Sequence, residues 1–163
     1  VVQEELKSET NNIISKVLID KQSPFIKSII LNKGSNTNLK KGMLVLSKGN
    51  MIGRIIEVNY LSSRVLLISD LNSKIPVKIG HYGENGIMTG VGDNFGELDF
   101  LPKKSLIKNN DLVFTSGSDG IFKEGIPIGK IVKKDNDKNT VEFFVDLNQI
   151  NFVTILNYKK DDK

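Results

Sequence analysis

The strongest constraint on how this chain can fold is the regular alternation of short apolar runs with turn-forming residues. From residue 13 to residue 156, runs rich in Ile, Val, Leu and Phe are separated by Gly, Asn, Ser, Asp and Pro. The turn residues recur roughly every 8 to 12 positions, a spacing typical of β-sandwiches and small β-barrels. The pattern lacks the helical segments that connect parallel strands. The sequence therefore predicts an all-β fold.

The apolar runs define about a dozen expected strands of ordinary length. We expect strands at residues 14–19, 25–31, 43–46, 51–58, 64–69, 75–79, 86–90, 97–100, 111–115, 127–133, 141–145 and 152–156. Lys48-Gly49-Asn50 predicts a tight hairpin, because Gly and Asn accept positive φ at little cost. A wholly polar loop at 134–139 predicts a second hairpin.

The first dozen residues carry the one helical pattern of the chain. Val2 and Leu6 are four residues apart, and Ile13 lies one heptad beyond Leu6, which fits the a/d seam of a coiled coil. Because the chain begins with Val1, we interpret residues 1–12 as the end of a coiled-coil helix that starts upstream. At the other terminus, we expect residues 159–163 to form a disordered polar tail.

Composition narrows the chemistry that the chain can perform. Cysteine is absent from the 163 residues, which excludes thiolate nucleophiles, redox motifs and sulfur-ligated zinc sites. The net charge of +4 leaves a small-barrel polyanion or nucleic-acid binder as an open alternative. The phenylalanines lie in apolar runs such as 142–145, which favours a place in the core over stacking on bases. No apolar run of about 18 residues predicts a transmembrane span.

A serine-hydrolase triad is the sharpest enzymatic hypothesis. His81, the single histidine, could pair with Ser116 as nucleophile and with Asp70 or Asp111 as the orienting acid. The sequence leaves that geometry open. A histidine in a glycine-flanked turn is more typical of the surface, and we expect these residues to lie far apart and the chain to have no catalytic site.

Metal and phosphate sites have equally weak support. Asp135, Asp137 and Asn139 alternate as in a calcium loop, but the central Gly and the distal Glu of an EF-hand are missing. A second group, Gly86, Gly90, Gly92 and Gly96, does not form a phosphate-binding motif that opens a helix. We interpret these glycines as bends and bulges, and we predict no metal and no cofactor.

A faint internal repeat is visible in the sequence. Residues 39–47, followed by an Ile-Gly-Arg-Ile motif at 52–55, resemble residues 107–116, followed by Ile-Gly-Lys-Ile at 128–131. Two β subdomains of related plan would explain the similarity. Chance likeness between two hairpins remains the alternative at this point.

Several segments, taken in order, resemble the extracytoplasmic part of the MreC family of bacterial rod shape-determining proteins. The matching segments are DKQSPF at 20–25, LNKGSN at 31–36, LKKGMLV at 39–45, IGRI at 52–55, RVLLISD at 64–70, PV at 76–77, DLVFTSG at 111–117 and GIFKEGIPIGK at 120–130. Two positions depart from the family pattern: Lys123 replaces a usual proline, and Asn110 replaces a usual glycine. Both departures fall in turns.

The resemblance implies a particular domain organisation. It implies two small six-stranded β-barrels, one of them similar in plan to half of a chymotrypsin-like protease but without its triad, preceded by the end of the coiled coil. We expect the first barrel to be discontinuous, with residues 13–60 and 123–158, and the second to comprise residues 61–122.

The resemblance also implies a function. It implies a non-enzymatic scaffold of the cell-elongation machinery, the periplasmic domain of a single-pass inner-membrane protein that organises peptidoglycan side-wall synthesis. The implied partners are the penicillin-binding transpeptidase, MreD, RodZ and, through membrane partners, the MreB filament. Self-association as a homodimer through the helix, and β addition at exposed sheet edges, are the expected modes of contact. A serine-hydrolase-like enzyme and a polyanion binder are the competing hypotheses.

Overall fold

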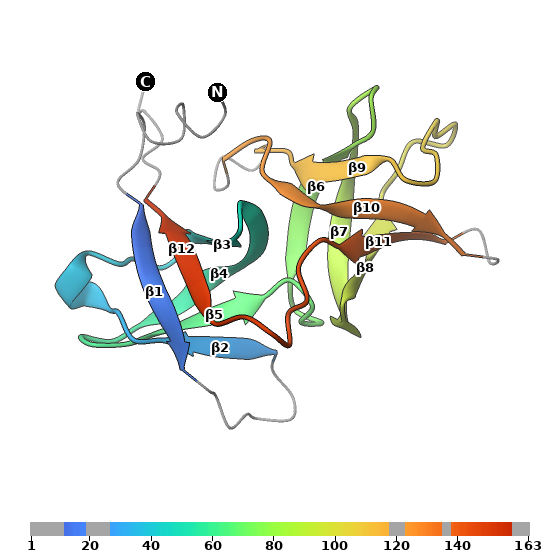
Figure 1. Ribbon diagram of the computed structural model, residues 1–163. Helices are drawn as coiled ribbons and strands as arrows, with labels where there is room; N and C mark the ends of the chain where they lie inside the picture. The colour runs from blue at the N-terminus through green and yellow to red at the C-terminus, as the bar shows by residue number, and fades with distance from the viewer. Residues whose placement is uncertain (1–11, 19–26, 118–122, 135–137, 158–163) are drawn as a thin grey trace, which may run out of the picture.

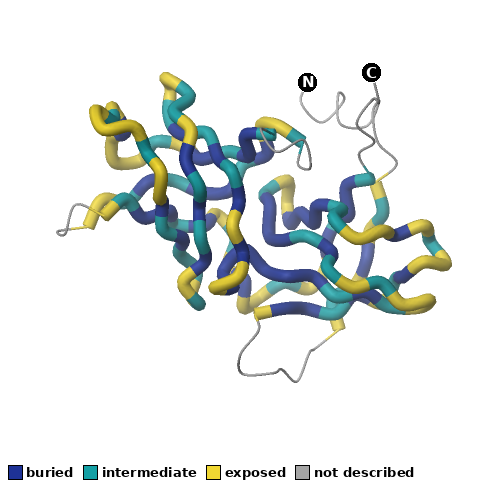
Figure 2. Tube along the Cα trace, turned by 180° about the vertical axis from the view of Figure 1, so that it is seen from behind, coloured by how far each residue is buried: buried dark blue, intermediate teal, exposed yellow. Residues whose placement is uncertain are grey.

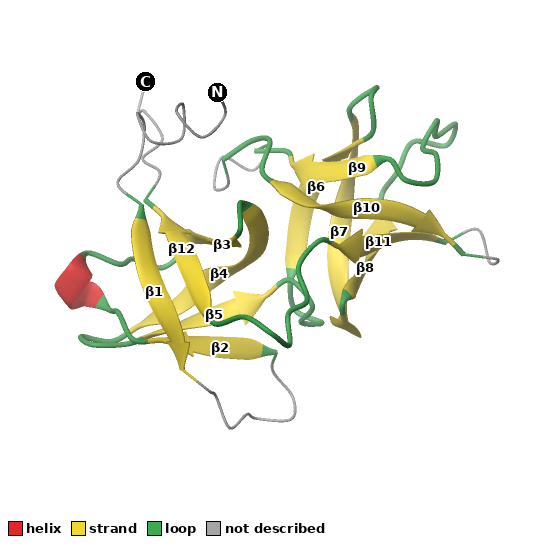
Figure 3. Ribbon diagram, viewed as in Figure 1, coloured by secondary structure: helices red, strands yellow, loops and turns green. Residues whose placement is uncertain are grey.

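A computed structural model describes residues 12–18, 27–117, 123–134 and 138–157 (Figure 1). The elements are β1 (Ile13–Leu18), β2 (Ser28–Leu31), η1 (Ser35–Thr37), β3 (Leu44–Ser47), β4 (Asn50–Val58), β5 (Ser63–Leu67), β6 (Lys74–Ile79), β7 (Glu84–Asp93), β8 (Phe95–Asp99), β9 (Leu112–Thr115), β10 (Pro127–Lys133), β11 (Asn139–Phe143) and β12 (Phe152–Leu156). Figure 3 shows strands throughout, with one short 3₁₀ turn. The predicted all-β fold is confirmed, and each expected strand overlaps an observed one.

The strands close into two six-stranded barrels that lie side by side (Figure 1). Around the first barrel the order is β1-β12-β3-β4-β5-β2, and around the second it is β10-β11-β8-β7-β6-β9. The two predicted barrels are confirmed, but the predicted boundaries are wrong. β5 pairs with β2 and β4 and completes the first barrel, whereas β10 and β11 pair with β9 and β8 in the second. Hydrogen bonding between segments that are distant in the sequence decides to which barrel a strand belongs. The position of a strand along the chain does not reveal which barrel that is.

Inward-facing aliphatic side chains fill both barrels. Ile52, Ile55 and Val65 are at most 1% exposed in the first barrel, and Val77 and Met88 are fully buried in the second. Burial alternates along β6, β7 and β8 because successive side chains point to opposite faces of a sheet, whereas all four residues of β3 are buried. Figure 2 shows the buried residues lying mainly along the strands and the exposed residues lying mainly in the loops. These cores anchor the loops that carry the candidate surfaces.

The two barrels repeat one hairpin in detail. In the first, the Gly42 N–H donates to the Ile55 carbonyl at 2.8 Å, and in the second the Asn110 N–H donates to the Ile131 carbonyl at 2.8 Å. Gly42 and Asn110 both have positive φ, 91° and 71°. The predicted internal repeat is therefore a repeat of structure. It also explains why Asn110 can replace a glycine, since Asn tolerates the left-handed region better than most residues.

The repeat extends into the segments that leave each hairpin. Asp70-Leu71-Asn72 and Asp146-Leu147-Asn148 share one sequence, a match that the sequence analysis missed. In both, the first Asp accepts a hydrogen bond from the backbone N–H two residues later, at 2.8 Å from Asn72 and 3.0 Å from Asn148. Each segment turns the chain out of its own barrel and leads it into the other.

The consequence is a reciprocal exchange of strands. Two successive halves of the chain contribute β1–β6 and β7–β12, and in each half the sixth strand completes the barrel of the other half. Starting from equivalent strands, the order β3-β4-β5-β2-β1-β12 matches β9-β10-β11-β8-β7-β6. Each barrel therefore needs one strand from the opposite repeat in order to close.

Candidate functional site

The proposed catalytic residues of the second barrel lie at opposite ends of β9. His81 follows Gly80, whose N–H donates to the Leu112 carbonyl at the start of β9. Ser116 follows the end of β9, and its N–H donates to the Pro76 carbonyl at 3.1 Å. Ser116 lies four positions beyond Leu112, which amounts to about 13 Å along an extended strand. The expected separation of His81 and Ser116 is confirmed, and the two do not form a nucleophile–base pair.

The two candidate acids serve the fold in different places. Asp111 lies beside Gly80, and its Oδ2 accepts the Lys108 N–H at 2.8 Å. Asp70 is 1% exposed in the crossover between the barrels, where its carboxylate accepts the Lys27 N–H at 2.7 Å and the Asn72 N–H at 2.8 Å. Neither carboxylate orients His81 toward Ser116. The histidine, the serine and the two alternative acids considered for the triad thus lie in three separate places.

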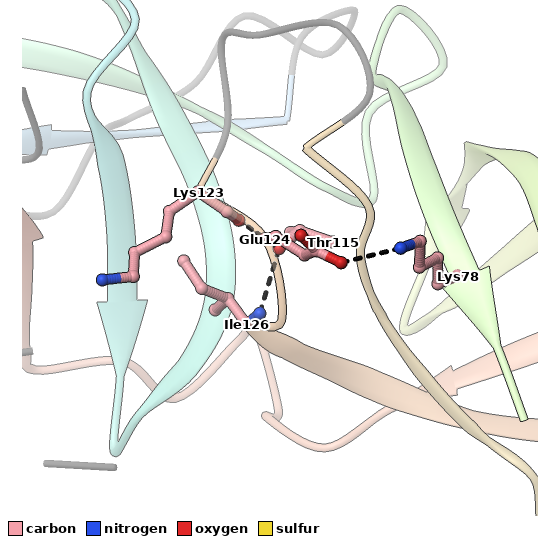
Figure 4. Close-up of polar contacts among 5 residues, drawn as sticks. All are labelled: Lys78, Thr115, Lys123, Glu124 and Ile126. Carbon is pink, nitrogen blue, oxygen red and sulfur yellow. Dashed lines mark hydrogen bonds and ion pairs between the residues drawn. The ribbon is translucent and has the colours of Figure 1, made fainter. Parts of the chain in front are cut away.

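The Thr-Ser-Gly segment after β9 closes a turn. Thr115 is fully buried; its hydroxyl donates to the Lys123 carbonyl and accepts the Ile126 N–H at 3.0 Å (Figure 4). Lys78 on β6 contacts Glu124 of the same turn, with 2.7 Å between Nζ and Oε1. Lys123, which departs from the family's proline, thus contributes its backbone carbonyl. The segment fixes the path of the backbone into β10.

The described part of the chain contains no cluster of three His, Asp or Glu side chains that could hold a metal ion. Asp135 and Asp137 lie outside the described residues, and Asn139 begins β11. The interpretation of the glycines as bends and bulges is confirmed for Gly90 and Gly92: the β7–β8 register shifts between Gly90 and Asp93, where Gly92 has a φ of 89°. Gly86 and Gly96 instead lie in regular strand pairs, opposite Val77 and Val141.

A groove of about 350 Å³ separates the two barrels. Its lining combines Leu18 and Ile29 of the first barrel with Asp93 of the second and Asn148 of the connecting segment. The apolar and polar side chains that line the groove do not form a set of polar groups directed at a single point, as a catalytic site would.

Closure of the barrels removes the sheet edges that β addition would need. Every strand of the described ranges has a neighbour on both sides within its barrel. Closed barrels leave no continuous row of unpaired backbone groups along a strand. Side-chain surfaces are therefore the available means of contact.

Exposed apolar side chains include two groups that the sequence analysis missed. The first-barrel face comprises Ile14, Leu18 and Phe152, which are 66%, 41% and 62% exposed on the paired strands β1 and β12. The second group lies at one end of the second barrel and comprises Tyr82, Phe100 and Leu106, which are 71%, 84% and 58% exposed. In the sequence, β1 has apolar residues on both of its faces. That pattern alone does not distinguish a strand with one exposed docking face from a strand that is buried on both faces.

The expectation that the phenylalanines lie in the core is largely wrong. Phe143 is 7% exposed, but Phe144 beside it is 44% exposed. Alternation at the end of β11 explains this pair, because neighbouring residues face opposite sides.

Comparison with known proteins identifies the family. Residues 17–157 match the family described as "Rod shape-determining protein MreC, barrel core". The chain belongs to the MreC family. The MreC barrel core therefore accounts for both barrels, and the resemblance noted in the sequence is confirmed.

Two relatives carry the name Cell shape-determining protein MreC. The protein of Cereibacter sphaeroides is 30% identical over 154 residues, covering 94% of this chain and 51% of that protein. The protein of Caulobacter vibrioides is 34% identical over 145 residues, covering 89% and 42%. The chain thus spans about half the length of the curated relatives it matches.

Solved MreC structures share the architecture. MreC from Pseudomonas aeruginosa superimposes with a TM-score of 0.80 at 25% identity, covering 89% of this chain and 98% of that one. The major periplasmic domain of the cell shape-determining filament MreC gives 0.80 at 24% identity, covering 92% and 99%. MreC in its complex with the penicillin-binding protein PBP2 from Helicobacter pylori gives 0.66 at 20% identity, covering 90% and 98%. The last two likenesses establish a shared fold.

No helix within the described ranges has the length and apolar character needed to span a bilayer.

Proposed function

We propose that this chain is part of a non-enzymatic scaffold of the cell-elongation machinery, which organises peptidoglycan side-wall synthesis through protein contacts. The observation that carries the proposal is the match to the MreC family over residues 17–157. The relatives are named for cell-shape determination, and the Helicobacter pylori neighbour is solved in a complex with a penicillin-binding protein.

The absence of enzymatic activity is part of this proposal. It is supported by the dispersal of His81, Ser116, Asp70 and Asp111, and by the structural hydrogen bonds of Thr115. The serine-hydrolase hypothesis predicts that His81→Ala abolishes a hydrolytic activity. We expect instead that this variant retains binding to the transpeptidase.

The proposed setting is the periplasm, with the chain belonging to a single-pass inner-membrane protein. A structural neighbour described as a periplasmic domain supports the location. The proposed partners are a penicillin-binding transpeptidase, MreD, RodZ and the MreB filament reached through membrane partners. A second copy of the chain completes the set.

We assign self-association to the first-barrel face. β1 follows directly after the heptad pattern of residues 1–12, so a paired helix would bring the β1 strands of two copies together. Ile14 and Phe152 lie on neighbouring strands, where Ile14 pairs with Thr154 and Lys16 pairs with Phe152. Burial of these side chains against a second copy would remove apolar surface from water.

Binding to the transpeptidase tests the scaffold proposal. The purified chain is passed over the immobilised periplasmic region of the class B penicillin-binding protein of the same organism, and binding is followed by interferometry. We expect saturable binding by the wild-type chain and by His81→Ala alike. A folded wild-type chain that shows no binding would contradict the proposal.

Sedimentation equilibrium tests the assignment of the first-barrel face. We expect the double variant Ile14→Ser, Phe152→Ser to weaken self-association by at least tenfold. The matched control, Tyr60→Ser with Leu61→Ser, removes two side chains that are 70% and 64% exposed in the β4–β5 turn, and it should leave self-association unchanged. Equal effects of the two double variants would refute the assignment.

A further inference from the structure

One end of the second barrel presents large apolar side chains to solvent. It consists of the β6–β7 turn, residues 80–83, and the β8–β9 loop, residues 100–111, which projects beyond the strands in Figure 1. Tyr82, Phe100 and Leu106 are 71%, 84% and 58% exposed there. Large exposed apolar groups gathered in one place typically mark an interaction site. We call this surface the barrel-end surface.

Hydrogen bonds fasten the loop to the turn. The Glu84 carboxylate, at the start of β7, accepts the Ser105 hydroxyl at 2.7 Å and the Leu106 N–H at 2.6 Å. Asp111 accepts the Lys108 N–H at 2.8 Å. The exposed apolar groups are therefore displayed by an anchored loop, which lowers the entropy that binding would remove.

Phe100 has an unfavourable backbone as well as an exposed side chain. Its φ is 61°, in the left-handed region, where bulky residues are rare and where Asn or Gly would be accommodated at lower cost. An aromatic residue therefore occupies a position that neither the backbone nor burial favours. Such outliers concentrate at functional sites.

The same loop is cationic. Lys103, Lys104 and Lys108 are all exposed, and residues 100–110 contain no acidic side chain. Lys133 lies beside the loop, since its N–H donates to the Asn109 side-chain oxygen at 3.2 Å. The acidic groups next to this segment include Glu84 and Asp111, which hold its backbone, and Asp99. The barrel-end surface thus combines apolar anchors with positive charge.

We propose that the barrel-end surface docks on an anionic phospholipid bilayer. Exposed Phe, Leu and Tyr side chains, together with the exposed lysines of the same loop, match a surface that has negative headgroups above an apolar interior. A protein partner is less well matched, because lysine is depleted from the cores of protein interfaces. The inference is independent of the transpeptidase contact.

Vesicle co-sedimentation of the full chain tests the inference. Vesicles of phosphatidylglycerol and phosphatidylethanolamine are compared with vesicles of phosphatidylcholine. The triple variant Lys103→Gln, Lys104→Gln, Lys108→Gln should lose about fivefold in affinity per lysine, close to a hundredfold in all. The pair Phe100→Asn, Leu106→Ser should lose at least tenfold, and Asn suits the left-handed backbone at position 100.

Matched controls on the first barrel separate specific docking from general attraction. The triple variant Lys40→Gln, Lys41→Gln, Lys48→Gln removes the same charge from the first barrel and should change affinity less than threefold. Thermal melts check that each variant is folded. If the Phe100→Asn, Leu106→Ser variant fails to fold, the comparison of the two triple lysine variants tests the proposal. The proposal is overturned if the wild-type chain ignores anionic vesicles or if both lysine triples lose equally. It is also overturned if the loop variants keep lipid binding and lose a protein partner instead.

Discussion

Replacing Asp70 by Asn should destabilise the whole chain by about 2 kcal/mol. Asp70 is 1% exposed and accepts two backbone hydrogen bonds, from Lys27 at 2.7 Å and Asn72 at 2.8 Å. A hydrogen bond to a charged group contributes about 1.5 to 3 kcal/mol net. Asn keeps one acceptor oxygen but directs its amide N–H₂ at the other donor, so one bond is lost. Lys27 and Asn72 are exposed residues and both hydrogen bonds are part-buried, so we place the loss in the lower half of that range.

The repeat provides a matched control for this measurement. Asp146 occupies the equivalent position in the second connecting segment, is exposed, and accepts the Asn148 N–H at 3.0 Å and the Asn94 side-chain N–H at 3.2 Å. Asp146→Asn should cost below about 1 kcal/mol, because solvent replaces contacts at an exposed site.

Urea unfolding at neutral pH, followed by circular dichroism, measures both variants. With unchanged m-values, we expect the Asp70 variant to lose about 2 kcal/mol, which lowers Tm by about 4 to 8 °C for a chain of this size. A loss of unfolding free energy below about 0.5 kcal/mol, or one equal to that of Asp146→Asn, would refute the conclusion that the Asp70 hydrogen bonds stabilise the crossover.

Three further substitutions test other parts of the fold by the same unfolding measurement. Thr115→Val should cost about 1 to 3 kcal/mol, because the Lys123 carbonyl and Ile126 N–H lose their buried partner, and Thr115→Ser should recover most of it. Ser63→Ala should be neutral or stabilising by up to about 1 kcal/mol, because the Ser63 hydroxyl is buried without a hydrogen-bond partner among the described residues. Gly129→Ala should cost about 3 kcal/mol or more, since a Cβ there would lie 2.1 Å from the Glu142 carbonyl oxygen on β11; a loss near 1 kcal/mol would contradict that packing.

Local patterning in the sequence was sufficient to predict the strands and their turns. The hairpin at Lys48-Gly49 formed where expected, although Lys48, with a φ of 51°, takes the left-handed position that had been assigned to Asn50. Turn chemistry and alternation are local properties, so a single sequence contains them. The two Ile-Gly motifs of the repeat can also be read directly from the sequence. The structure gives the reason for their glycines: Gly53 and Gly129 each lie against a carbonyl oxygen of the next strand of the hairpin, and an added Cβ atom would approach that oxygen to 2.3 Å and 2.1 Å.

Membership of the barrels and the exposed surfaces depend on long-range pairing, which the sequence does not display. β5 and β10 carry no mark of the barrel in which they pair, and the expected boundaries failed at these strands. Phe100 and Phe152 are apolar residues in strand-like segments, and only the tertiary structure reveals that they face solvent. The shared Asp-Leu-Asn of the connecting segments was present in the sequence, but its meaning depends on the strand exchange.

The strand exchange gives the two barrels a fixed relation to each other. β6 leaves the first repeat to complete the second barrel, and β12 returns to complete the first, so separation of the barrels would break the hydrogen bonds of both strands. Asp70 in one crossover and the main-chain bond from the Gly92 N–H to the Ser69 carbonyl, at 2.7 Å, hold the junction itself. Two domains joined by a single linker would be expected to move relative to each other. Here two crossovers run in opposite directions, so the chain joins the two barrels twice. The proposed first-barrel face and the proposed barrel-end surface therefore belong to one unit, whose barrels cannot separate without loss of strand pairing in both.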